Sequence, residues 1–213
     1  MKTGSPRRVP IIATLVVFAA ALIMVGLGVW QLRRAEEKSA IIDQLRANPS
    51  RPPAAFPEAG PVPDSLMFRR STITCPAVVR WSVEAGRAAD GVTGFRFMAH
   101  CRGERGGAGP LIAVGVSDRP DAAPLWNGGV VRGWITRAPD HRPLLALVSG
   151  PEVILPPMLI AADAPAGLRP LAPPRVENIP NNHTSYAVQW FSFAAIALVI
   201  YALALRRRQT KTR

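Results

Sequence analysis

The chain has 213 residues, of which 26 are Lys or Arg and 14 are Asp or Glu, giving a formal net charge of +12. The tails, residues 1–10 and 206–213, hold eight of the basic residues and none of the acidic ones, so the rest of the chain carries 18 basic against 14 acidic residues, a net charge of +4. Those basic residues are scattered singly or in pairs, which excludes the basic stripe with interleaved aromatic residues that is typical of nucleic-acid binding.

Residues 11–32 form a long apolar stretch without a formal charge. At about 1.5 Å per residue such a helix crosses a hydrocarbon core of about 30 Å, which predicts a transmembrane helix. A cleaved signal peptide is the alternative, but its apolar centre is normally shorter and is followed by a small-residue cleavage site. The spacing of Ile41, Ile42 and Leu45 predicts that the helix continues to about Ala47.

Residues 33–67 are predicted to be this helical extension followed by a linker, because prolines recur from Pro49 to Pro63 and exclude regular structure. Short runs between turn residues over 68–160 predict a β-rich domain. The predicted strands are Phe68–Cys75, Val78–Glu84, Phe95–Cys101, Leu111–Val116, Val130–Thr136 and Leu144–Leu147. The third strand alternates clearly, so its odd-numbered and even-numbered residues are expected on opposite faces.

Residues 161–185 are rich in proline and are predicted to return to the membrane as an extended segment. A second apolar stretch, 186–205, predicts another transmembrane helix, which the basic tail 206–213 follows. Because short Lys- and Arg-rich segments stay on the cytoplasmic side, we expect both termini in the cytoplasm. The predicted fold class is a membrane protein in which two transmembrane α-helices flank a β-rich (α+β) extracytoplasmic domain.

The two cysteines, Cys75 and Cys101, lie in the region assigned to the extracytoplasmic side, where disulfides persist. The sequence leaves three interpretations open: a disulfide between strands, two separately buried thiols, and a copper or redox site with His100. His100 lies on the polar face of its predicted strand and is expected to be solvated.

Enzymatic motifs are sparse. The chain has no G-x-S-x-G, no H-E-x-x-H, no phosphate-binding Walker loop, and no Cys and His cluster with metal-ligand spacing. A membrane peptidase or redox enzyme would need a catalytic triad or a dithiol motif, so we expect a protein that is not an enzyme.

His183 precedes the second apolar stretch and is followed by Tyr186 and Trp190 at helical spacing. One interpretation is a helix end capped by Asn181 or Asn182 and bordered by interfacial aromatic residues. The other is an imidazole ligand for a haem iron beside an aromatic wall, in which Asn182, Tyr186 and Trp190 are cofactor-binding candidates with His183. Candidate residues at the end of the first apolar stretch and directly after it are Trp30, Gln31, Arg34 and Lys38. The two cations among them, Arg34 and Lys38, could pair with haem propionates or lipid phosphates.

These two regions resemble the surfeit locus protein 1 family at both ends of the chain. Gly28, Trp30-Gln31, Arg34 and Lys38 match its G-x-W-Q-x-x-R-x-x-x-K signature after the first span. The signature that opens its second span is matched by Asn181-Asn182-His183, Tyr186-Ala187 and Trp190-Phe191, with Tyr201 and Arg206-Arg207 closing the span. Two features depart from the family: within the first motif Glu37 replaces a usual aromatic residue, and in the domain between the motifs the family's central N-R-G-W-V-P segment is not present as such.

The resemblance implies a two-span assembly factor for haem-copper cytochrome c oxidase. It implies help in inserting haem A into the catalytic subunit, or in stabilising that subunit, with His183 at the position of the family's proposed haem ligand. The implied partners are oxidase subunit I, haem A synthase and membrane lipid. A membrane-tethered scaffold that binds oxidase subunits without handling haem is the alternative.

Localisation is predicted from the same features. Only about eight residues precede the first apolar stretch, which leaves little room for an amphipathic mitochondrial presequence. Arg outnumbers Lys by 23 to 3, as in a GC-rich bacterial gene. We therefore expect a bacterial inner membrane with the central domain in the periplasm.

Overall fold

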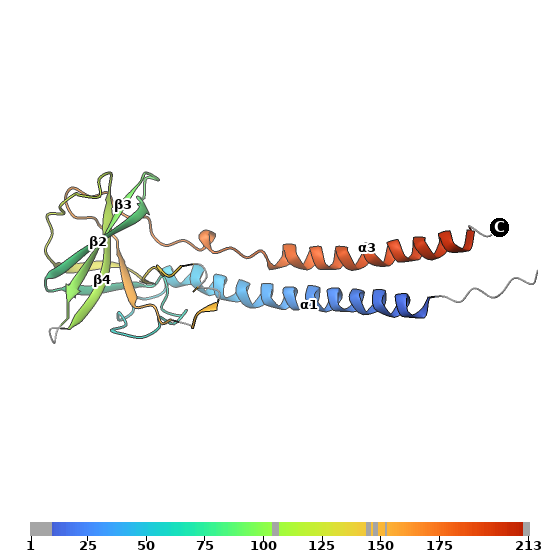
Figure 1. Ribbon diagram of the computed structural model, residues 1–213. Helices are drawn as coiled ribbons and strands as arrows, with labels where there is room; N and C mark the ends of the chain where they lie inside the picture. Colours follow the sequence, from blue (N-terminus) through green and yellow to red (C-terminus); the bar gives the residue numbers. More distant parts are fainter. Residues whose placement is uncertain (1–9, 104–106, 144–145, 147–148, 152, 211–213) are drawn as a thin grey trace, which may run out of the picture. The chain divides into compact units, whose positions relative to one another are not determined.

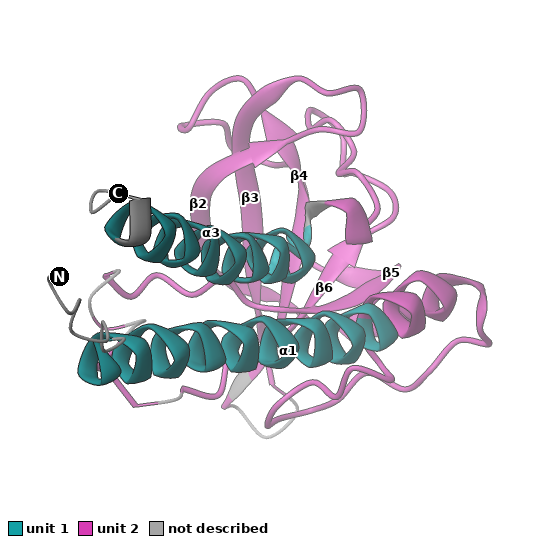
Figure 2. Ribbon diagram, turned by 90° about the vertical axis from the view of Figure 1, so that its right-hand side faces the viewer, with its two compact units in different colours: residues 1–41, 179–213 teal, residues 42–178 magenta. Residues whose placement is uncertain are grey.

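A computed structural model describes residues 10–103, 107–143, 146, 149–151 and 153–210 of the chain. Its elements are the helices α1 (Ile11–Ala47) and α3 (His183–Thr210), the short 3-10 helices η1 (Asn48–Ser50) and η2 (Val176–Asn178), and six strands (Figure 1). The strands are β1 (Arg70–Cys75), β2 (Val78–Arg87), β3 (Thr93–Arg102), β4 (Ala108–Ser117), β5 (Gly129–Arg137) and β6 (Pro157–Ala161). Two compact units result: Met1–Ile41 with Ile179–Arg213, and Ile42–Asn178 (Figure 2).

Both predicted helices are present in the structure. α1 begins directly after Pro10, whose carbonyl accepts the Thr14 amide at 2.9 Å, and ends before Pro49, whose ring cannot continue an α-helix. The predicted helical extension to Ala47 is therefore confirmed. The described chain contains two helices that are long and apolar enough to cross a membrane, Ile11–Ser50 and His183–Arg208.

One six-stranded sheet forms the second unit, in the order β1-β5-β6-β4-β3-β2. Only β4 and β6 run parallel, and the other neighbours are antiparallel. In a flat sheet with strands about 4.8 Å apart, the edge strands β1 and β2 would lie about 24 Å from each other. However, only Pro76 and Ala77 join them, and such a link spans at most about 11 Å. The sheet must therefore curl until its two edges meet at this end.

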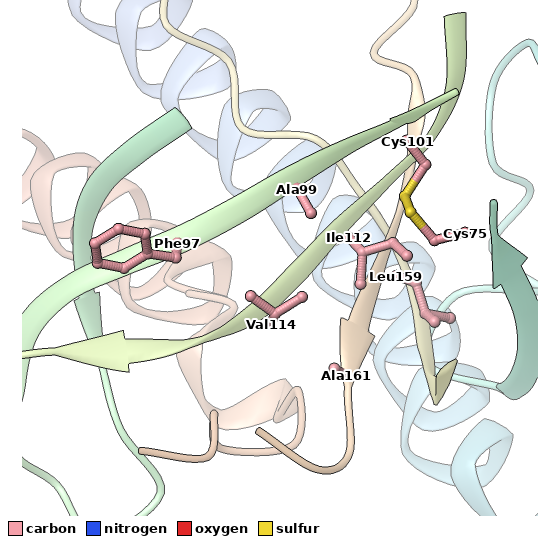
Figure 3. Packing of buried hydrophobic residues seen from close by; sticks show 8 residues of the cluster. All are labelled: Cys75, Phe97, Ala99, Cys101, Ile112, Val114, Leu159 and Ala161. Atoms are coloured by element: carbon pink, nitrogen blue, oxygen red, sulfur yellow. A yellow bond between two sulfur atoms is a disulfide. The ribbon is translucent and has the colours of Figure 1, made fainter. Parts of the chain in front are cut away.

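A disulfide between Cys75 of β1 and Cys101 of β3 fixes this closure, with a Cα–Cα distance of 5.3 Å (Figure 3). The three interpretations of the cysteines are thereby reduced to the first, the disulfide between strands. Because both sulfurs are bonded to each other, neither is available as a thiolate for the copper or redox site with His100. Both cysteines are buried in the main hydrophobic core.

The sheet buries a different hydrophobic cluster on each face. Phe97, Ala99 and Cys101 pack in the first cluster, whereas Met98 packs in the second, which confirms the predicted alternation of β3. The first cluster is completed by Cys75, Ile112, Val114, Leu159 and Ala161. The second cluster contains Leu171 from the proline-rich return segment, which pairs with Ala88 by an isolated bridge and so covers that face.

Three predictions for the strands need correction. β1 begins at Arg70 rather than Phe68, because Phe68 has a left-handed backbone with φ of 65° and turns the chain before the strand starts. Residues 144, 145 and 147 of the predicted strand Leu144–Leu147 lie outside the described residues, and Ala146 is helical. The sequence analysis missed β6, which lies at the end of the predicted β-rich domain, directly before the proline-rich segment, and pairs with β5 and β4.

His100 is half-buried rather than solvated. Its Nε2 lies 2.8 Å from the Ser82 hydroxyl oxygen, and its Nδ1 lies 3.2 Å from a guanidinium nitrogen of Arg80. Since a guanidinium can only donate, Nδ1 is the acceptor and Nε2–H donates to Ser82. Burial, and after it the positive charge of Arg80, lower the pKa of His100.

The first prediction concerns the disulfide. Replacing both Cys75 and Cys101 by Ala should lower the free energy of unfolding by about 3 kcal/mol, because the disulfide restricts the conformations of the unfolded chain and its loss raises the entropy of that state. Urea unfolding of the full chain in detergent can be followed by the fluorescence of Trp81 and Trp126, whose rings pack edge to face at 6.3 Å. An unchanged unfolding midpoint would show that the curled sheet closes without the bond.

The second prediction concerns pH. Because the pKa of His100 is lower in the folded chain than the usual value of about 6.5, its stabilising contribution is complete above about pH 6.5 and declines as the pH falls toward the folded pKa. His100→Gln, which keeps a hydrogen-bonding side chain, should remove that part of the decline. The measurement is unfolding free energy against pH for both proteins, and identical slopes would contradict it.

Candidate functional site

The first unit is an antiparallel helical hairpin formed by α1 and α3 (Figure 2). Hydrogen bonds join its two ends: Thr14 to Tyr201 at one, and Gln31 to His183 at the other. The buried residues of α1 in this unit are spaced seven apart, and those of α3 likewise. They are Ala21, Gly28 and Ala35 on α1, and Ala187 and Ala194 on α3. We call these five small residues the seam; small side chains let two helix backbones approach closely.

Gly28 shows how close the helices are at the seam. A Cβ atom placed there would lie 2.6 Å from Cε1 of the Phe191 ring, so the ring occupies the space that a side chain would need. Gly26, two residues earlier, has no atom within 4 Å of its ideal Cβ. Of the two glycines, only Gly28 is therefore required for packing between α1 and α3.

The Gln31–His183 hydrogen bond is the central contact of the candidate site. Nδ1 of His183 lies 2.7 Å from Oε1 of Gln31. An amide oxygen can only accept, so Nδ1 carries the hydrogen and, in the neutral ring, Nε2 keeps its lone pair. Among the described residues, no hydrogen bond engages Nε2. This is how a ligating histidine is commonly oriented, with one nitrogen held and the other available.

Two asparagines before α3 have different roles from the predicted cap. The carbonyl of Asn182 accepts the amide of Tyr186 at 3.2 Å, which starts the helix, but no side-chain cap by Asn182 is present in the described structure. Asn181 instead directs its side-chain amide to α1, where it donates to the Ala35 carbonyl at 3.4 Å and the Ser39 hydroxyl at 3.2 Å. Among the described residues, neither asparagine therefore caps α3 through its side-chain oxygen, and Oδ1 of Asn181 has no hydrogen-bond partner.

The aromatic candidates lie beside the seam and not within it. Trp30 is 55% exposed and Tyr186 is 50% exposed. Trp190 is half-buried and its ring meets that of Phe193 edge to face at 6.2 Å. At 100° per residue, Trp30 lies about 200° from Gly28, so it projects from the side of α1 that faces away from α3. Tyr186 and Trp190 lie about 100° and about 60° from Ala187 in the same sense, so both project to one side of α3. We call this side the aromatic flank.

The two cationic candidates differ in their surroundings. Arg34 projects toward the aromatic flank, where its guanidinium pairs with Glu37 at 2.8 Å and both side chains are largely exposed. Lys38 is half-buried, close to the line of Gln31 and Ala35, and no ion pair of Lys38 occurs within the described part of the chain. Lys38 is therefore the less compensated cation at this end of the hairpin.

The residues present fit a haem better than a bare metal ion. Across the described ranges, no group of three or more His, Cys, Asp or Glu side chains could hold a metal ion. A haem needs fewer protein ligands, since its porphyrin supplies four nitrogens and one histidine can complete the axial position. His183 offers that nitrogen, and the aromatic flank offers apolar surface.

Sequence reasoning named these candidate residues but missed their pairings. Gln31 and His183 were both candidates, yet nothing in their separate motifs showed that Gln31 orients the imidazole. The contacts of Asn181 with Ser39 and of Thr14 with Tyr201 were also missed. The signal that could have found them is the spacing of small residues seven apart in both helices, because it indicates which face of α1 packs against which face of α3.

Comparison with known proteins gives two findings. The model of the SURF1 family, the family of surfeit locus protein 1, matches residues 18–195, which include both Gln31 and His183. A "SURF1-like protein" of Monosiga brevicollis is 26% identical over 220 residues, covering 86% of this chain and 83% of its own length.

The third prediction concerns the tautomer of His183. In the full chain labelled with ¹⁵N-histidine, the ring should show the Nδ1–H form, and Gln31→Leu should shift it toward a mixture because the acceptor is lost. Only three histidines are present, so His100→Gln and His141→Gln assign the signals. A native ring in the Nε2–H form would contradict the proposed orientation.

Proposed function

Because this chain belongs to the SURF1 family, we propose that it acts in the assembly of haem-copper cytochrome c oxidase. In this proposal it helps to insert haem A into the catalytic subunit or stabilises that subunit while it is loaded. Its partners are oxidase subunit I and haem A synthase. The protein handles haem as cargo and is not an enzyme.

The Gln31–His183 pair is the observation that supports haem handling. Gln31 holds Nδ1–H, which leaves Nε2 of His183 as an oriented nitrogen ligand. Tyr186 and Trp190 would cover the apolar face of the macrocycle. Lys38 would pair with a propionate more readily than Arg34, because the charge of Arg34 is already compensated by Glu37.

The hairpin geometry supports a membrane location. Thr14 and Gln31, which bond to opposite ends of α3, are separated by roughly 25 Å of helix rise, close to a hydrocarbon core of about 30 Å. An antiparallel hairpin puts both chain ends on one side, and the basic tails favour the cytoplasm. A bacterial inner membrane with the central domain in the periplasm also agrees with the disulfide, since that compartment is oxidising.

A scaffold that binds oxidase subunits without touching haem is the second candidate. It is favoured by the sheet unit, which is large, has its own hydrophobic core and does not contain His183. The two candidates make opposite demands on the imidazole: a scaffold tolerates its removal, whereas a haem handler does not.

The fourth prediction separates them. In membranes of a strain lacking the gene, the haem A band of the reduced-minus-oxidised spectrum should be diminished and should return with the native chain. His183→Ala should fail to restore it, and Gln31→Leu should restore it only partly, because the ligand remains but is less well oriented. The matched control is His141→Ala, which removes an exposed imidazole of the other unit.

The outcomes separate the candidate functions. Full return of the band with His183→Ala would favour the scaffold. An undiminished band in the strain lacking the gene would remove oxidase assembly as the function. Immunoblots of the membranes must show that all variants accumulate to the native level.

A further inference from the structure

The sheet unit has a cavity of about 270 Å³ beside the β1–β5 strand pair. Its lining includes Arg70 and Thr72 of β1, Arg132 and Trp134 of β5, and Pro53 and Ala162 from the flanking segments. The strand register puts Arg70 opposite Trp134 and Thr72 opposite Arg132. Residues at these alternate positions share one face of the sheet, so all four side chains project to the same side.

The two arginines of the cavity carry charges that are not compensated within the described residues. Most of the carboxylates are held by other arginines, as in the pairs Arg96–Glu84, Arg119–Asp121, Arg137–Asp64, Arg142–Asp140 and Arg169–Asp90. Within the described residues, neither Arg70 nor Arg132 forms an ion pair or a side-chain hydrogen bond. Asp163 lines an adjoining cavity with Arg132 without reaching ion-pair distance.

The polar groups of the cavity are mostly hydrogen-bond donors. Each guanidinium and the Trp134 indole can only donate, and the Thr72 hydroxyl can donate as well. Two nearby acceptors are already used: the Ala54 carbonyl accepts from Ser71, and the Arg132 carbonyl accepts from the amide of Ala162. An excess of donors and positive charge beside an apolar ring favours a ligand that is negatively charged at one end and apolar at the other.

We propose that this cavity binds an amphiphilic oxyanion, a carboxylate or phosphate group attached to a short apolar or aromatic body. Arg70 and Arg132 hold the anionic group by charge-assisted hydrogen bonds, and Trp134 contacts the apolar body. The ligand chemistry is shared by small organic acids or phosphate esters and by anionic lipid head groups. The inference does not depend on haem handling, because every residue involved belongs to the sheet unit.

The fifth prediction uses phenyl phosphate as the probe. Titrated into the full chain in nonionic detergent, it should change the tryptophan fluorescence and raise the thermal unfolding midpoint. Arg132→Gln or Arg70→Gln should weaken its affinity by about tenfold or more, the usual effect of losing a hydrogen bond to a charged group. The matched control is Arg87→Gln, which removes an exposed arginine of β2 that does not line the cavity.

Two further variants keep the test independent of folding defects. Arg132→Lys keeps the charge but loses the planar donor pair, so its affinity should lie between those of the native chain and Arg132→Gln. Trp134→Phe should remove most of the fluorescence change while the thermal shift persists. Thermal unfolding without ligand identifies any variant that is misfolded.

The source of the oxyanion is tested by competition with dihexanoyl phosphatidylglycerol below its micelle concentration. Competition would support the site with a lipid head group as its ligand, and binding of phenyl phosphate without competition would support it with a free organic oxyanion. Equal affinity in Arg132→Gln, Arg70→Gln and Arg87→Gln would overturn the site. Inorganic phosphate binding as tightly as phenyl phosphate would overturn the role of the apolar body.

Discussion

Close approach of two helix backbones along the seam is the constraint on which the helical unit depends. Gly28 leaves the space that the Phe191 ring fills, and Ala187 and Ala194 are small side chains on the side of α3 that faces α1. Only at such a short separation can the short amide of Gln31 reach the His183 ring at 2.7 Å. The seam therefore does more than pack the hairpin: it brings the amide oxygen of Gln31 within hydrogen-bond distance of Nδ1 of His183.

The sheet unit depends on a different constraint, the convergence of its two edges. Two residues connect β1 to β2 although four strands lie between them in the sheet, so the sheet curls and encloses the cluster around Phe97 and Ile112. The Cys75–Cys101 bond fixes the closure across the same end. With the strands fixed in register, Arg70 and Arg132 are held on one face beside Trp134, where they remain uncompensated although most of the unit's carboxylates have arginine partners.

The fold could be predicted from the sequence where local periodicity was strong. The uninterrupted apolar runs gave both helices, and period-two alternation gave β3 with the correct residues on each face. Prediction failed where the decisive interaction was not local. β6 is short and begins at Pro157, the second of two consecutive prolines, so it is stabilised by pairing with β4 and β5 and not by its own composition. The start of β1 depends on the left-handed backbone of Phe68, which an aromatic residue adopts only when surrounding contacts require it.

For the site, the sequence by itself determined which residues were available: the motif residues around Gln31 and His183, the small residues spaced seven apart, and the two cysteines. The tertiary structure alone decided their partners. Gln31 and His183 are 152 positions apart, Asn181 and Ser39 are 142 apart, and the cysteines are 26 apart. The physical reason is that helical and strand periodicity depend on residues that are neighbours in the sequence. A hydrogen bond, a disulfide or an uncompensated charge instead depends on which distant side chains the packed backbone brings within a few ångströms.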